Sequence, residues 1–370
     1  MNIIWMSWKD RSHPLSGGAE AVSGAIMDRL ARDGHSVKHL TASYPGAKDD
    51  EKVNGINIIR LGGRYSVYLK VKAYFKHNLA EWPDVIIDEM NTIPFAAALY
   101  SQKRTVLLTY QLARKVWFYQ IVFPLSAIGY LIEPLYLRYI APHYKMVLTE
   151  SESTRQDMAR YGFNTSRTHI FQVGMELKPL QSLPKKADRS LVLSLGAVRP
   201  MKRTLHAVKA FESARDEDTS LHMVIAGSTS SSYGQKVIQY VNNSRHVDFI
   251  EVKGRVSDNE KTDLMHQAGI ILVTSVKEGW GLIVIEANSQ GTPAAVYDTD
   301  GLRDSVQNGK TGLLVNDGNY VAMGSTIVNL LNDDALYNNL REAAWMWSKE
   351  FTLENSYQSF MEAIKLDDAA

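Results

Sequence analysis

The chain has 370 residues, of which 45% are apolar and 22% charged, a balance typical of soluble globular proteins. A net charge of +1 argues against a nucleic-acid-binding protein, and the absence of cysteine excludes disulfides and thiolate metal sites. This length favours two domains of ordinary size, each with its own core.

The two halves of the chain differ in charge. Residues 1–175 carry 21 Lys and Arg against 15 Asp and Glu, whereas residues 176–370 carry 20 against 25. Either this is chance, or the first half faces an anionic surface such as phospholipid. No stretch approaches the roughly 18 consecutive apolar residues of a spanning helix. Met1 leads directly into a strand-like run, so we expect no signal peptide. We expect a cytoplasmic protein, either free or peripheral at the inner face of the membrane.

The chain opens with a strand, a loop and a helix. Residues 2–6 form the predicted strand, and the helix runs from Gly17-Gly18-Ala19-Glu20 to about Arg32 before a second strand at 37–40. This is the opening unit of a doubly wound sheet, without the GxGxxG fingerprint of nicotinamide-binding proteins. The Gly17-Gly18 pair either lets backbone amides meet a diphosphate or a sugar, or forms a plain tight turn.

Strands and helices then alternate, which predicts a parallel sheet. The strands are expected at 56–61, 85–88, 105–109 and 146–149, and the helices at 67–78, 94–101 and 153–161. Ligands of such sheets lie beyond the carboxyl ends of the strands. Asp88-Glu89, Tyr110-Gln111 and Glu150-Ser151 fall at those ends, either as ligand contacts or as ordinary loop residues.

Residues 114–145 are rich in aromatic residues and leucine, with basic residues interspersed. We predict one or two helices, broken near Pro124 and Pro134. They form either part of the core with an amphipathic surface, or a patch that binds a substrate or a membrane surface.

The first domain is expected to span residues 1–175. A charged linker with two prolines follows at 176–190 and can act as a hinge. The second domain is expected at 191–345, with a further helical segment at 346–370.

The second half begins with a strand at 191–195 and a basic loop before a helix at 204–214. Arg199 and Lys202, with Arg203 a weaker candidate, either neutralise a leaving diphosphate or form a solvated loop. Strands follow at 223–226 and 246–252, and Ser257 with Glu260 forms a capping box.

The stretch from Glu278 to Pro293 follows a buried apolar strand at 269–272. Glu278-Gly279-Trp280-Gly281 is predicted to be a loop, and Leu282 to Ser289 a helix that carries Glu286. The helix N-terminus suits a phosphate or a sugar hydroxyl, and two carboxylates suit hydroxyls and a ribose diol. The alternative is a capping Glu and an ordinary surface Glu. Short strands at 294–296 and 313–315 and helices at 320–331, 335–349 and 353–365 complete the chain.

The stretch EGWGLIVIEANSQGTP resembles the Glu-x7-Glu signature of retaining glycosyltransferases of family 4. Asn308-Gly309-Lys310-Thr311-Gly312-Leu313-Leu314-Val315 is similar to another segment of the family. Gly196 and Lys202 match the family's G-R-x-x-x-x-K-G pattern, except that Ala197 replaces the Arg. Tyr110 stands where relatives often have a His, and Tyr cannot act as a base near neutral pH.

The resemblance implies an α/β protein of GT-B architecture, with two Rossmann-like parallel-sheet domains facing across a cleft. It implies a hexosyltransferase that uses a nucleotide sugar and retains the anomeric configuration, and a last helix that packs back on the first domain. The acceptor is a lipid-linked compound, a saccharide or a small molecule. Two alternatives stay open: a nucleotide-sugar epimerase of the same fold, or a non-catalytic scaffold.

Site residues carried by the resemblance fall into three groups. The catalytic group is Arg199, Lys202 and Glu278. The donor-binding group is Gly17, Gly18, Gly227, Gly254, Val256, Gly279, Trp280, Gly281, Leu282 and Glu286. The possible acceptor-side residues are Glu20 and Tyr110. We expect no cofactor, because the nucleotide sugar is a co-substrate, and no metal, because nothing resembles the Asp-x-Asp metal site of the other major glycosyltransferase fold.

Overall fold

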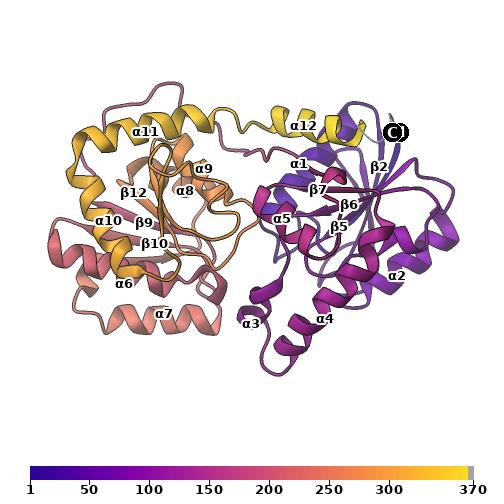
Figure 1. Ribbon diagram of the computed structural model, residues 1–370, viewed down its shortest axis with the longest axis horizontal. Coiled ribbons are helices and arrows are strands. Elements are labelled where there is room, and N and C mark those ends of the chain that lie inside the picture. Colours follow the sequence, from indigo (N-terminus) through magenta and orange to yellow (C-terminus); the bar gives the residue numbers. More distant parts are fainter. Residues whose placement is uncertain (366–370) are drawn as a thin grey trace. The chain divides into compact units, whose positions relative to one another are not determined.

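The computed structural model describes residues 1–365, whose contacts divide them into two compact units. The first unit contains Met1–Arg114, Pro124–Gly174 and the chain from Leu353 onward, and the second contains Lys115–Phe123 and Met175–Thr352. The ribbon colours in Figure 1 distinguish these segments along the chain. The last five residues of the predicted segment 346–370 lie outside the described residues.

The first unit is built on an eight-stranded sheet in the order β3-β4-β2-β1-β5-β6-β7-β8. Its strands are β1 Asn2–Met6, β2 Ser36–Thr41, β3 Asp50–Val53, β4 Ile56–Arg60, β5 Val85–Met90, β6 Arg104–Thr109, β7 Met146–Thr149 and β8 Thr168–Ile170. All pairs are parallel except β3 with β4. The order reverses direction between β1 and β5, which is the topological switch point of a doubly wound sheet.

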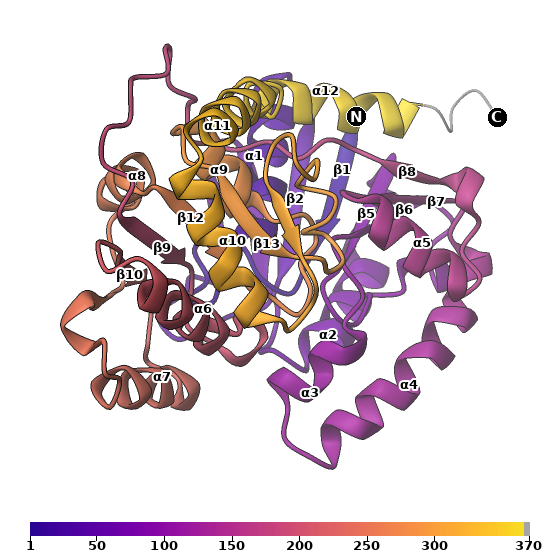
Figure 2. The same cartoon turned by 60° about the vertical axis from the view of Figure 1, so that its left-hand side comes forward.

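Among residues 1–365, the first unit contains five α-helices, and one of them, α12, comes from the C-terminal part of the chain. They are α1 Gly18–Arg32, α2 Val67–Tyr74, α4 Leu125–Ile140, α5 Glu152–Arg160 and α12 Leu353–Lys365. Helix α12 lies beside α1 (Figures 1 and 2). Its Phe360 stacks on Trp5 of β1, with ring centroids 5.7 Å apart. Both side chains are fully buried, so α12 completes the core of this unit.

One predicted helix in the first unit is wrong. The helix expected at 94–101 is only a 3-10 turn, Ala97–Leu99. The Asp88 carboxylate accepts hydrogen bonds from the amides of Phe95 (2.9 Å) and Ala97 (2.8 Å), which satisfies backbone donors without a helix. The helix expected at 67–78 is present, as α2 and a π-helix that continues it, Phe75–Leu79.

The predicted break at Pro134 is also wrong, because Pro134 lies inside α4. A proline removes the N–H that would bond to the carbonyl four residues earlier, here that of Tyr130. Arg114 Nη1 donates to this carbonyl oxygen at 3.0 Å and to the Glu133 carboxylate at 3.5 Å. The guanidinium thus replaces the missing donor and the helix continues.

The second unit has a six-stranded parallel sheet in the order β11-β10-β9-β12-β13-β14. Its strands are β9 Leu191–Leu195, β10 His222–Ala226, β11 Ile250–Gly254, β12 Ile270–Val273, β13 Ala294–Tyr297 and β14 Leu313–Val315. Its helices are α3 Trp117–Gln120, α6 Thr204–Glu217, α7 Ser232–Asn242, α8 Asp258–Gln267, α9 Leu282–Ser289, α10 Tyr320–Asn332 and α11 Asp334–Ser348. The strand expected at 246–252 begins only at Ile250, because residues 247–249 form a 3-10 turn. The switch point lies between β9 and β12.

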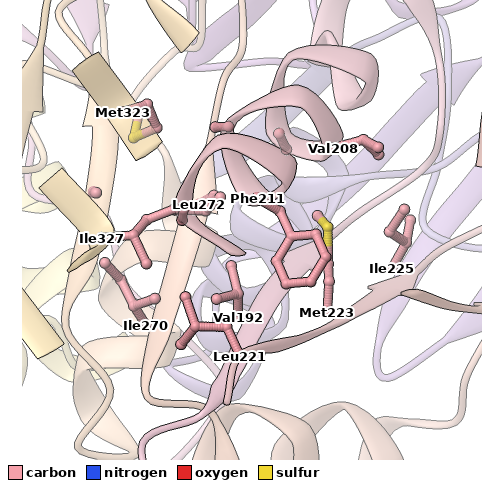
Figure 3. Packing of buried hydrophobic residues seen from close by; sticks show 14 of the residues in the cluster. Val192, Val208, Phe211, Leu221, Met223, Ile225, Ile270, Leu272, Met323 and Ile327 are labelled. Carbon is pink, nitrogen blue, oxygen red and sulfur yellow. The ribbon is translucent and has the colours of Figure 1, made fainter. Parts of the chain in front are cut away.

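Successive apolar side chains along the strands point to opposite faces of this sheet, so each face has its own hydrophobic core. Val192, Ile270 and Leu272 point to one side, where they pack in the cluster that contains Phe211 of α6 and Ile327 of α10 (Figure 3). Their neighbours Leu191, Leu193, Ile271 and Val273 belong to a second cluster with residues of α8 and α9. Successive side chains of a strand point to opposite faces, so a sheet covered on both faces needs continuous apolar strands. The prediction of two parallel-sheet domains is confirmed.

Candidate active site

Two loops of the second unit meet at its switch point, one after β9 and one after β12. They bring together Lys202 and Glu278, which are 76 residues apart in sequence. The Lys202 ammonium lies 2.5 Å from Glu278 Oε1, and the Ser275 hydroxyl donates to the same oxygen at 2.5 Å. Both charged side chains are partly exposed. The pair therefore occupies the place where doubly wound sheets bind ligands, while remaining accessible to one.

Arg203 holds these two loops together. It adopts the left-handed backbone conformation, with φ of +48°, and its guanidinium donates to the carbonyl oxygens of Thr274 and Ser275 at 2.9 Å each. The Thr274 hydroxyl returns a hydrogen bond to the Lys202 carbonyl at 3.0 Å. Arg203 also pairs with Asp317 at 2.5 Å. Its side chain is committed to structure, which leaves Lys202 and Arg199 as the cations that the loop presents.

The loop between Glu278 and α9 is shaped by a close approach at Gly301. A Cβ added at Gly301 would lie 2.1 Å from the carbonyl oxygen of Glu278, and φ is +81°. The Glu278 amide donates to the Asp300 carbonyl at 3.0 Å. Gly281, with φ of +108°, then starts α9. Only glycine fits these positions, and the turn places the free amides of the helix N-terminus just after Glu278.

Glu286 lies on α9, and its carboxylate is held by Lys261 of α8. Lys261 Nζ lies 2.7 Å from both carboxylate oxygens of Glu286. The pair is partly buried, with side-chain exposures of 28% for Lys261 and 17% for Glu286. Lys261 was not among the predicted site residues. Its place on α8 gives no local signal, because only the packing of α8 on α9 brings the two charges together.

The remaining predicted donor-site residues of this unit follow the carboxyl ends of neighbouring strands. Gly227 lies against the β9 loop, since a Cβ there would be 1.9 Å from the Gly196 carbonyl oxygen. Its amide donates to the Gly254 carbonyl at 2.6 Å, and Val256 follows that turn. Arg199 is exposed at the rim of the β9 loop. Trp280 instead packs on Phe351, with ring centroids 5.6 Å apart.

In the first unit, Gly17 and Gly18 start α1, and Glu20 caps it. The Glu20 carboxylate accepts from the Gly17 amide at 2.7 Å and pairs with Lys9 at 2.9 Å. The glycines are exposed, whereas Glu20 is only 3% exposed. Glu20 therefore fixes the turn, and the two glycines present their backbone.

Tyr110 belongs to a buried hydrogen-bonded group at the switch point of the first sheet. Its hydroxyl is 2.5 Å from the Ser23 hydroxyl, which donates to Glu89 Oε2 at 2.7 Å. The Trp5 indole N–H donates to the same oxygen at 2.7 Å. Burial, and then the negative charge of Glu20, raises the pKa of Glu89 to about 7. Burial also raises the pKa of Tyr110 well above its ordinary value, so Tyr110 acts here as a neutral hydroxyl.

Glu150 lies at the carboxyl end of β7 and is also buried. Burial, and then the charge of Glu89, holds its pKa well above the ordinary range. Its Oε1 has no hydrogen-bond partner among the described residues. Across residues 1–365 we find no group of three or more His, Asp or Glu side chains that could hold a metal ion. None of the helices described is long and apolar enough to cross a bilayer.

Two solved structures share the fold of this chain. Sucrose-phosphate synthase from Thermosynechococcus elongatus superposes with a TM-score of 0.81 at 20% identity, over 100% of both chains. Anabaena HepE, solved in complex with UDP and glucose, superposes with a TM-score of 0.75 at 15% identity, over 99% of both chains.

Sequence comparison gives the family. Residues 17–174 match the model of the glycosyl transferase 4-like domain, and residues 178–347 match that of glycosyl transferases group 1. The chain therefore belongs to the family 4 glycosyltransferases of GT-B fold.

Two curated relatives illustrate the range of this family. The poly(glycerol-phosphate) alpha-glucosyltransferase of Bacillus subtilis is 27% identical over 50% of this chain and 28% of its own length. The D-inositol 3-phosphate glycosyltransferase of Paenarthrobacter aurescens is 26% identical over 48% of this chain and 46% of its own length. The chain thus spans half or less of the length of these two relatives.

Proposed function

We propose that the protein transfers a hexose-type sugar from a nucleotide sugar to an acceptor hydroxyl, with retention at the anomeric carbon. The observation that carries this proposal is the Lys202–Glu278 pair at the switch point, 2.5 Å apart, immediately before the N-terminus of α9. One cation, one carboxylate and a set of free backbone amides meet there. A nucleotide sugar needs these three kinds of contact, for its diphosphate and its sugar hydroxyls.

Each charged residue has a distinct role in this proposal. Lys202, joined by the exposed Arg199, stabilises the negative charge that develops on the departing diphosphate. Glu278 accepts hydrogen bonds from sugar hydroxyls, next to the amides of Gly279 to Leu282. Glu286 accepts both hydroxyls of the ribose, and its pairing with Lys261 at 2.7 Å fixes the carboxylate beforehand. Gly227, Gly254 and Val256 border the nucleotide through their backbone.

Donor and acceptor are proposed from the relatives. HepE was solved with UDP-glucose, which supports a nucleotide-sugar donor and makes this compound the first to test. Two relatives are named for poly(glycerol-phosphate) and inositol 3-phosphate, which supports a polyol phosphate as the acceptor. A saccharide and a lipid-linked compound are the other acceptors to test. The Tyr110 group in the first unit is the acceptor-side part of this proposal, and the acceptor enters from the side of Gly17-Gly18. No metal takes part in it.

A membrane-surface role for α4 is part of the same proposal. The side of α4 that faces the protein contains Glu133 and Leu137, which are at most 1% exposed. Its outer face is apolar, with exposures of 47% to 67%. This outer face consists of Leu125, Ile128, Leu131, Ile132, Leu135 and Tyr139. An outward apolar stripe flanked by basic residues is typical of helices that lie in a lipid interface. Arg138 and Lys145 are exposed on or near this helix.

The decisive experiment is a transfer assay with UDP-glucose first, then other UDP-, GDP-, ADP- and dTDP-sugars. We expect release of the nucleoside diphosphate by the wild type, unchanged by excess chelator, and retention in the product by NMR. Nucleoside diphosphate release that chelator abolishes would contradict metal independence. An epimerised nucleotide sugar without acceptor would identify an epimerase, and binding without turnover of any donor would identify a scaffold.

A further inference from the structure

A pocket of about 420 Å³ lies at the opposite edge of the second sheet from the candidate active site. Its wall includes Leu191 at the start of β9, His222 at the start of β10 and Arg341 of α11. Residues 184–188, which lead into β9, form the rest of its rim with the C-terminal end of α8. The pocket faces the amino ends of the strands, whereas Lys202 and Glu278 follow their carboxyl ends. It is therefore a separate site within the same unit.

Cationic and imidazole groups dominate the lining. They are Lys185, Lys186, His222, His266 and Arg341, against a single carboxylate, that of Asp188. The Asp188 carboxylate already accepts from the Ser190 amide at 2.9 Å and from its hydroxyl at 2.6 Å. The wall of the pocket thus carries more cationic and imidazole groups than carboxylates.

Two of these cations, the half-buried Lys186 and the buried Arg341, bond to neutral acceptors. Lys186 Nζ donates to the Ala268 carbonyl at 2.6 Å and to the Thr292 hydroxyl at 2.8 Å. Arg341 donates to the carbonyls of Gly291 at 2.6 Å and Pro184 at 2.8 Å, and is 4% exposed. Within residues 1–365 neither side chain has a carboxylate partner. Buried charges are normally paired, because removing them from water is costly.

The same surroundings shift the pKa of Lys186. Burial, and then the charge of Arg341, lowers the pKa of Lys186 to about 7. An anion in the pocket would favour the ammonium form of Lys186. It would also accept hydrogen bonds from those N–H groups of Lys186 and Arg341 that are not used in the bonds described above. A lysine has three donors and an arginine five, and each uses two in the bonds described above.

We propose that this pocket binds a small anion that carries a phosphate group, at a site distinct from that of the donor nucleotide. Lys185 and His266 at the rim would meet the phosphate first, and Lys186 and Arg341 would hold it from the wall. Three features favour such a ligand. Lys186 and Arg341 have N–H donors left over, the lining has more cationic groups than carboxylates, and the volume of about 420 Å³ accommodates a small metabolite. A monoanion without further acceptors would leave most of these donors unused.

The pocket also connects to the helix that carries Glu286. Lys186 and Arg341 hydrogen-bond to Thr292 and Gly291, which follow directly after α9. The same Lys186 lies in the segment that leads from the first unit into β9. A bound anion would therefore restrict the motion of the C-terminal end of α9 and of residues 184–188, which lead into β9.

The test is a titration of the wild type with inorganic phosphate and with sulfate, at constant ionic strength, by calorimetry or thermal shift. The principal variant is Lys185→Ala with His266→Ala, because neither side chain has a hydrogen bond that the fold depends on. A matched double variant, Lys236→Ala with Lys310→Ala, removes two exposed cations outside the pocket. Lys202→Ala reports on anion binding at the candidate active site.

We expect saturable binding that is at least tenfold weaker in the pocket variant and within twofold of wild type in the matched control and in Lys202→Ala. Binding that survives in the pocket variant but is lost in Lys202→Ala would place the anion at the donor site and overturn the proposal. Absence of saturable binding to the wild type would also overturn it. Because only binding is measured, either result is independent of the proposed transferase activity.

Discussion

At the scale of single residues, the candidate active site is organised by charges that neutralise one another. Lys202 pairs with Glu278, Lys261 with Glu286, and Arg203 with Asp317. In each pair, the ionic contact holds both charged groups in a fixed orientation. Catalysis and binding depend on such preorganised groups, since a group already in place needs no reorganisation during the reaction.

The first prediction separates the two carboxylate–lysine pairs. Lys202→Ala should lower kcat by about 10²- to 10³-fold, because its proposed role is to stabilise charge on the departing diphosphate. Lys261→Ala should mainly raise the donor KM, by about tenfold, because it frees the carboxylate that we propose to bind the ribose. Steady-state kinetics with varied donor measures both, with Lys236→Ala as the control. A Lys261→Ala variant that loses kcat at unchanged KM would assign that pair a different role.

The second prediction concerns pH and Lys186. The pKa of Lys186 is about 7 in the folded protein against an ordinary value of 10.5, because of burial. Between these values the unfolded chain carries a proton that the folded chain has released. The free energy of unfolding should therefore rise with pH from 7 to 9 more steeply in the wild type than in Lys186→Met. Urea unfolding at both pH values measures this difference, and parallel curves would contradict it.

At the scale of elements, α4 is a helix whose apolar side faces outward. Its inward side is tied by polar groups: the Glu133 carboxylate accepts from the amides of Ala113 at 2.8 Å and Arg114 at 2.7 Å. Figures 1 and 2 show α4 at the periphery of the first unit. Burying its outer face in lipid would remove several large side chains from water, each worth roughly 1.5–3 kcal/mol when fully buried.

The third prediction follows from this helix. Leu131→Asp with Leu135→Asp should abolish sedimentation with vesicles that contain anionic lipid, while leaving activity on a soluble acceptor unchanged. The exposed Val321 of α10 supplies the control, since Val321→Asp adds a similar charge away from α4. Equal sedimentation of all three proteins, or no binding by the wild type, would exclude the lipid role of α4.

At the scale of the whole molecule, the chain forms the first unit from both of its ends. Helix α12 follows the second unit in sequence but contributes Phe360 and Tyr357 to the core of the first. Phe360 also meets Phe171 at a centroid distance of 5.9 Å, and Arg29 of α1 pairs with Glu354. The first unit therefore cannot complete its core until the second has been synthesised.

The fourth prediction tests this dependence. Phe360→Ala should destabilise the first unit by about 3–5 kcal/mol, because it leaves a cavity against Trp5 and Phe171. Calorimetry should show a lower transition for the first unit, while the donor still stabilises the second. The exposed Met346 supplies the control variant Met346→Ala. An unchanged calorimetric profile would mean that α12 contributes little to the first unit.

The sequence by itself determined the order of most strands and helices and the family signature, but β3, β8 and α7 were not predicted. Apolar runs such as 269–272 and turns marked by a glycine such as Gly281 are local patterns, so they can be recognised within a short window of sequence. The doubly wound topology then follows, because parallel strands with helical crossovers have few alternatives. Strand and helix positions near Asp88 and His246 were misplaced, because side-chain hydrogen bonds and 3-10 turns there override local propensity.

Only the tertiary structure decided which distant residues meet. It paired Lys261 with Glu286, joined Tyr110 through Ser23 to Glu89, and let Arg114 complete the helix around Pro134. It also grouped Lys115–Phe123 with the second unit and collected the cations of the pocket from three separate segments. These contacts depend on packing between elements far apart in the chain, and packing of that kind leaves no period or spacing in the sequence.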